Sequence, residues 1–173
     1  MKGWGNILTA AILLVAQTII WNYFNLSQFV LLTFLPAMIL CLPVRIGTVR
    51  ALLLSFLMGF AVDFFASGVL GLTCAALLPV ALCRRFIITI VYGEEMFARG
   101  ENISFRRQGS FKMNLAVVIA TAIFLIVYIW MDGAGMRPFW FNLVRFLSSL
   151  AVSSLFSLFI ASLLTEDNNA RWR

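Results

Sequence analysis

Six apolar segments, separated by short polar stretches, fill most of this 173-residue chain. We expect them at 3–24, 29–42, 51–66, 70–92, 113–131 and 139–164. The chain is 62% hydrophobic and only 12% charged, whereas about 25% of the residues in soluble domains are charged. A soluble protein of this length has too little interior to bury so much apolar surface. The sequence therefore predicts an all-α polytopic membrane protein of one domain, with the bilayer as its solvent.

The positions of the 13 Lys and Arg residues indicate how these segments are oriented. If the N-terminus is cytoplasmic, eleven of the 13 lie on the cytoplasmic side, Arg137 lies outside, and Arg145 lies within the last apolar segment. Short loops rich in Lys and Arg remain on the cytoplasmic side of a membrane. We therefore expect both termini in the cytoplasm. We also expect the only long loop, 93–112, to lie against the lipid headgroups on that side.

The second segment, 29–42, fits a membrane span least well. It is shorter than the roughly 20 residues that a spanning helix needs, Pro36 interrupts it, and Pro43 ends it. Proline frees a backbone carbonyl, which neighbouring helices must satisfy within a bilayer. We expect a kinked helix in this segment, or a locally thinned bilayer around it.

Asp63, near the outer end of the third segment, is the first of the polar residues that need an explanation. A carboxylate within a membrane segment is costly and often functional. Ser55, Gly59, Asp63 and Ser67 recur every fourth residue, so they form one stripe on a helix that another helix can approach closely. The pattern predicts that Asp63 faces protein, with Arg145 of the last segment as its basic partner. Two alternatives stay open: headgroup water could solvate Asp63, and Arg145 could extend to the outer surface.

The last segment carries a second stripe of small polar residues, formed by Ser149, Ser153 and Ser157. Such a stripe is typical of a packed helix–helix interface, and the alternative is a polar path for a substrate. Gln17 and Asn22 in the first segment are expected to make local hydrogen bonds.

The residue inventory argues against catalysis and against metal or cofactor binding. The chain has no His and only 3 Cys, none of them at a metal-ligand spacing. It has no paired carboxylates within the membrane segments and no Gly-rich phosphate loop. The net charge of +6 is explained by cytoplasmic loops that face anionic lipid. We therefore expect a non-enzymatic protein with no cofactor and no nucleic-acid partner.

Five residues of the third and fourth segments carry a resemblance to a known family. Gly59, Asp63, Gly68, Gly71 and Leu72 match the pattern G-x-x-x-D followed by G-x-x-G-L. This pattern resembles that of the MreD family of bacterial rod shape-determining membrane proteins. The chain length, the six segments and the cytoplasmic termini are similar to that family as well.

The resemblance implies a scaffold of the cell-elongation machinery in the bacterial inner membrane. Members of the family work with MreC, a single-span protein with a periplasmic coiled coil, and with the MreB filament. They also work with the RodA glycosyltransferase and its class B transpeptidase in peptidoglycan synthesis. The family fold is similar to that of the substrate-binding subunits (S-components) of energy-coupling-factor transporters. The motif residues, together with Arg145, Ser149 and Ser153, are then candidates for an interface with MreC or for a structural motif.

An alternative function is that of a small-molecule-binding subunit of such a transporter. A ligand-binding protein needs a pocket with converging polar groups. The apolar segments of this chain contain few polar residues, and the predicted outer loops are short. The sequence therefore favours the scaffold.

Overall fold

The structure is a computed structural model, and it describes residues 4–23, 30–42, 46–67, 69–93, 110–133 and 138–169. These residues form an all-α bundle, as predicted. Its elements are α1 (Trp4–Tyr23), α2 (Leu35–Leu40), α3 (Thr48–Val62), the π-helical turn η1 (Asp63–Ser67), α4 (Leu72–Tyr92), α7 (Ser110–Gly133) and α8 (Phe139–Asn169).

Four helices of the described part of the chain are long and apolar enough to cross a membrane. They are α3 with η1, α4, α7 and α8; in α1, the stretch whose side chains the structure describes, Thr9–Tyr23, is apolar but shorter. The helices α7 and α8 extend beyond the predicted segments 113–131 and 139–164. A helix can continue through the polar residues at the ends of an apolar segment when neither Gly nor Pro stops it. Hydropathy therefore underestimates the length of the helix.

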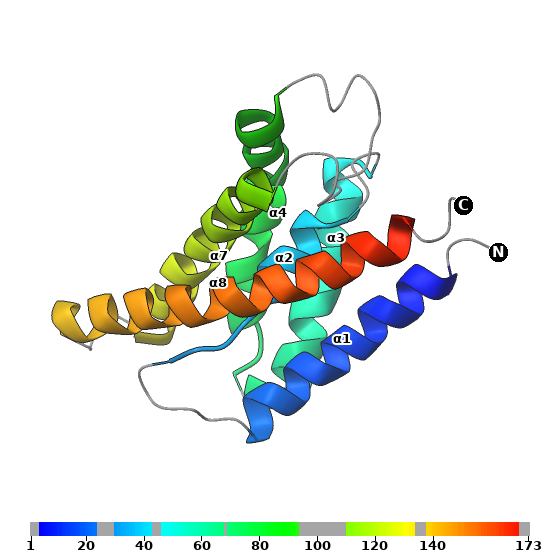
Figure 1. Ribbon diagram of the computed structural model, residues 1–173. Helices are drawn as coiled ribbons and strands as arrows, with labels where there is room; N and C mark the ends of the chain where they lie inside the picture. Colours follow the sequence, from blue (N-terminus) through cyan, green and yellow to red (C-terminus); the bar gives the residue numbers. More distant parts are fainter. Residues whose placement is uncertain are drawn as a thin grey trace.

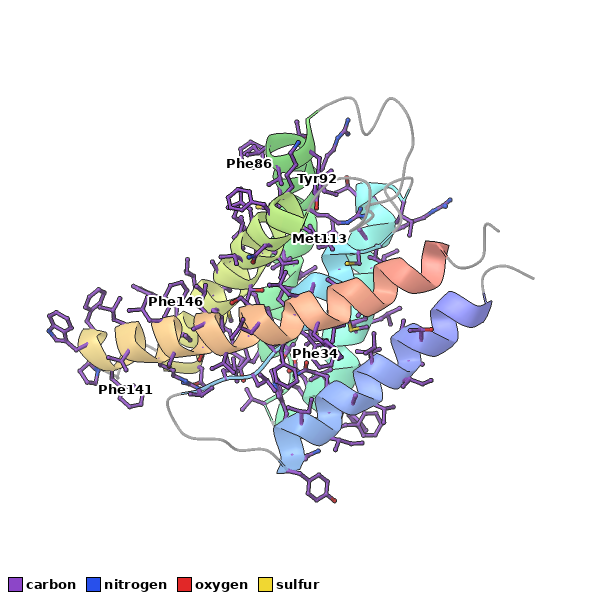
Figure 2. The ribbon with its side chains drawn as sticks, in the orientation of Figure 1. Phe34, Phe86, Tyr92, Met113, Phe141 and Phe146 are labelled. Carbon is purple, nitrogen blue, oxygen red and sulfur yellow. The ribbon has the colours of Figure 1, made fainter. Side chains whose placement is uncertain are left out.

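The short helix α2 lies at the centre of the bundle. The helix α3 packs against α4, and α7 packs against α8. The short helix α2 contacts α4, α7 and α8. All six residues of α2 are buried. Figure 1 shows α1 and α8 crossing the near side of the molecule, with α2 and the extended segment that precedes it behind them. Phe34, the last residue before α2, occupies the middle of the bundle (Figure 2).

The predicted kinked helix over 29–42 is wrong. Residues 31–34 are not helical, and the helix begins only at Leu35. Pro36 lies in the first turn of α2, where a missing N–H costs nothing because the first helical N–H groups have no intrahelical partner. Proline therefore starts a short helix here and does not interrupt a long one.

The side chains of α8 supply hydrogen bonds to one edge of segment 31–34. The Leu31 N–H donates to Ser149 Oγ at 2.8 Å, and the Thr33 N–H donates to Ser153 Oγ at 3.1 Å. Ser153 Oγ donates in turn to the Leu31 carbonyl at 2.8 Å. Ser157 Oγ donates to the Thr33 carbonyl at 3.3 Å. The predicted serine stripe therefore binds extended backbone, as a neighbouring β-strand would.

The helix α1 supplies hydrogen bonds to the other edge of the same segment. The side-chain amide of Gln17 accepts from the Phe34 N–H at 3.1 Å and donates to the Leu32 carbonyl at 3.1 Å. Trp21 Nε1 donates to the same carbonyl at 2.6 Å. Successive residues of an extended chain direct their backbone groups to opposite sides. Hence Leu31 and Thr33 bond α8, whereas Leu32 and Phe34 bond α1.

The far end of α2 is held by an arginine of α4. Arg84 is buried, and its Nη2 donates to the carbonyl of Leu42, just beyond the end of α2. A cation at the C-terminus of a helix is favoured by the helix dipole. Both ends of the central segment are therefore fixed by polar side chains of the surrounding helices.

Ser153→Ala should destabilise the bundle because it leaves one buried N–H and one buried C=O of segment 31–34 without a partner. The expected loss is about 2 kcal/mol, which lowers Tm in detergent by about 4–8 °C for a chain of this size. Ser154→Ala is the matched control, since Ser154 Oγ bonds only the Ala151 carbonyl of its own helix. Equal Tm values for the two variants would contradict the assignment.

Candidate functional site

The motif residues of the third and fourth segments meet at the turn between α3 and α4. Gly59 lies on the face of α3 that packs against the first turn of α4. A Cβ built at Gly59 would lie 2.8 Å from both the Cα and the backbone N of Cys74. Real Cβ atoms do not approach backbone so closely, so only glycine fits at this crossing. The stripe of small residues therefore permits close contact within the chain, between α3 and α4.

Asp63 binds the N-terminus of α4. Its carboxylate accepts from the N–H groups of Gly71 at 2.9 Å, Thr73 at 3.0 Å and Cys74 at 3.3 Å. The side chain is fully buried. The first N–H groups of a helix lack intrahelical partners and carry partial positive charge, so they form a natural site for an anion. Asp63 is thus a cap supplied by the preceding helix across the turn.

The remaining motif residues shape the same turn. Gly71 is the residue before α4 and has a φ of 96°. Residues with a Cβ rarely adopt this left-handed backbone conformation. Leu72 begins α4 and is buried in the hydrophobic core. Gly68, the fifth residue of the motif, lies outside the described residues.

The helix α1 is tied to this turn as well. Asn22 Nδ2 donates to the Phe65 carbonyl of η1 at 2.9 Å. The α-helical pattern widens to a π-helical turn at Asp63–Ser67, and such turns leave backbone carbonyls without their usual i+4 partner. Asn22 bonds one of these carbonyls, so the first segment contributes to closing the α3–α4 turn.

The predicted contact between Asp63 and Arg145 is not formed. Arg145 Nη1 of α8 donates to Asp132 Oδ2 of α7 at 2.5 Å. Sequence spacing indicates the depth of Arg145 in the last segment but not the helix that lies beside it. Asp132 follows the predicted fifth segment, whereas in the structure it lies in the last turn of α7, where it faces α8. The pair joins the two helices of the α7–α8 hairpin.

The outward face of α3 and η1 carries an aromatic row that the sequence analysis did not single out. Phe56, Phe60 and Phe64 recur every fourth residue, and their side chains are exposed. Neighbouring ring centroids lie 6.3 Å and 6.4 Å apart, with interplanar angles of 17° and 24°. We call these three residues the phenylalanine ridge. Each lies one position after a member of the buried stripe, hence about 100° around the helix, and this spacing could have revealed the ridge.

Metal-binding chemistry is not indicated in the part of the chain that the structure describes. Within it, no group of three or more His, Cys, Asp or Glu side chains is placed to hold a metal ion. The polar side chains described above bind backbone groups or each other.

No protein-family model, no curated protein and no solved structure matches this chain.

Gly59→Ala should weaken the α3–α4 contact, because the added Cβ meets the backbone of Cys74, which cannot rotate away. The expected cost is about 1–3 kcal/mol of unfolding free energy, measurable by SDS titration of the protein in detergent. Gly47→Ala is the control, since a Cβ there meets nothing within 4 Å. Equal losses in the two variants would show that Gly59 is not a packing glycine.

Proposed function

We propose that this chain is a non-enzymatic membrane scaffold of the bacterial cell-elongation machinery, similar to the MreD proteins. The observation that carries the proposal is the α3–α4 turn, where four residues of the motif that resembles the MreD family converge. Gly59 permits close packing, Asp63 caps α4, Gly71 forms a left-handed turn, and Leu72 packs in the core. A motif that closes a helical hairpin supports a fold shared with that family.

Six crossings with cytoplasmic termini are part of the proposal. The second segment is the critical one, because it is short for a helix. Extended residues rise about 3.3 Å each and helical residues about 1.5 Å. Residues 30–42, extended at first and then helical, therefore reach about 28 Å, close to the ~30 Å of a hydrocarbon core. A segment of this mixed conformation crosses a bilayer with fewer residues than a helix needs.

The internal use of polar groups favours a scaffold over a transporter subunit. A vitamin-binding subunit needs polar side chains directed at its ligand. In this chain Gln17, Ser149 and Ser153 bond segment 31–34, and Asp63 caps α4. The surface of the bundle is instead rich in exposed apolar side chains, which suits association with other membrane helices.

The phenylalanine ridge is the surface that we assign to MreC. Gly59 and Asp63 face α4, so they cannot also contact MreC. We therefore assign the interface with MreC to the adjacent face of α3. Nearly parallel rings along one helix form a regular row of ridges and grooves into which the single membrane span of MreC packs. Through MreC the chain is joined to the MreB filament and to the RodA glycosyltransferase and its class B transpeptidase.

Phe60→Ala with Phe64→Ala should reduce co-purification of MreC at least fivefold, because central aromatic side chains of an interface typically contribute about 2 kcal/mol or more when truncated. Both proteins are co-expressed, extracted in mild detergent and captured through the scaffold. Phe159→Ala is the control, since Phe159 is exposed to the same degree as Phe64, 64%, but lies on another helix, α8. Unchanged recovery of MreC in the double variant would refute this interface.

A further inference from the structure

The α7–α8 hairpin ends at a surface of the bilayer. Trp130 near the end of α7 and Phe139 and Trp140 at the start of α8 are 74%, 71% and 75% exposed. Exposed aromatic residues at the end of a membrane helix mark the level of the lipid headgroups. Phe141, in the same turn of α8, lies near the free end of the hairpin (Figure 2). The first two turns of α8 therefore lie at the depth where headgroups meet acyl chains.

Arg145 lies about 9 Å below Phe139 along the helix axis, at 1.5 Å per residue. Its Nη1 is paired with Asp132 at 2.5 Å, and its side chain is 12% exposed. The Nε–H of the same guanidinium is shielded from solvent and has no hydrogen-bond partner among the described residues. The ion pair neutralises the charge of Arg145 but leaves one donor unused.

Asn142 supplies the complementary group. It precedes Arg145 by three residues, so the two side chains share one face of α8. The amide Oδ1 of Asn142 is shielded and lacks a partner in the described part of the structure. One donor and one acceptor are therefore unsatisfied on the same turn. Leaving a buried donor or acceptor unpaired is unfavourable, so a molecule that satisfies both groups is favoured here.

We propose that Asn142 and Arg145 bind a hydroxyl group of a lipid headgroup at this surface. A hydroxyl oxygen accepts from Arg145 Nε–H, and the hydroxyl hydrogen is donated to Asn142 Oδ1. A phosphate or carboxylate oxygen satisfies only the first, and it is repelled by Asn142 Oδ1 and by Asp132. Because both atoms are shielded, the proposal includes a rotation of the two partly exposed side chains when the lipid binds. The ligand class is a glycerol or sugar headgroup.

The test compares lipids added to the full-length protein in detergent, with binding followed by native mass spectrometry. Phosphatidylglycerol and phosphatidylserine carry the same net charge, but only phosphatidylglycerol has headgroup hydroxyls. Glucosyl-diacylglycerol has hydroxyls and no charge. Phosphatidylethanolamine has no hydroxyl and no net charge. We expect the two hydroxyl lipids to bind about fivefold more tightly, which corresponds to about 1 kcal/mol. Asn142→Leu and Asn142→Ala should each abolish this preference. Asn114→Leu, at an exposed position near the opposite end of α7, should keep it.

Three results would overturn the proposal. Phosphatidylserine binding as tightly as phosphatidylglycerol would show that no hydroxyl is needed, because anionic oxygens and an ammonium donor serve equally well. If the preference for hydroxyl lipids survives in both Asn142 variants, the lipid binds elsewhere on the protein. Water is then the partner of Asn142 Oδ1 and Arg145 Nε. Displacement of the lipid by free glycerol at equal concentration would identify a soluble polyol as the ligand. Size-exclusion profiles confirm folding, and either Asn142 variant suffices if the other fails to fold.

Discussion

A non-helical backbone segment in the interior of an apolar helix bundle must have its hydrogen bonds made by other groups, and this requirement organises the bundle. Residues 31–34 pass through the protein interior in extended form. The amide of Gln17 and the hydroxyls of Ser149, Ser153 and Ser157 bond their N–H and C=O groups from opposite sides. In hydrocarbon each unsatisfied group would cost several kcal/mol. The first and last helices are thereby held to the same central segment, although they are far apart in sequence.

Much of the helical framework could be predicted from the sequence, because apolar runs of this length have few other solutions in a bilayer. The conformation of residues 31–34 could not be predicted, since hydropathy does not distinguish a helix from extended backbone bonded by side chains. The spacing of Ser149 and Ser153 indicates their shared face but not what lies against it. For the same reason the predicted partner of Arg145 is wrong, whereas the glycine spacing around Gly59 does indicate a close helix contact.

The polar residues that stand out in the sequence act mainly within the fold. Asp63 caps α4, and Gln17 and the serines bind backbone groups. The two surfaces that we propose for partners are the phenylalanine ridge, for a membrane helix, and the site at Asn142 and Arg145, for a lipid headgroup. Polar groups that bind backbone inside the bundle, with apolar side chains over most of its surface, are what the bilayer as solvent favours.

Hydrogen exchange of the protein in lipid nanodiscs tests the central claim most directly. The amides of Leu31, Thr33 and Phe34 lie outside any helix, yet each donates to a side chain of α1 or α8. The account predicts that they exchange as slowly as the amides in the middle of α4. Exchange of these three amides as fast as that of unbonded backbone, with α4 still protected, would contradict it.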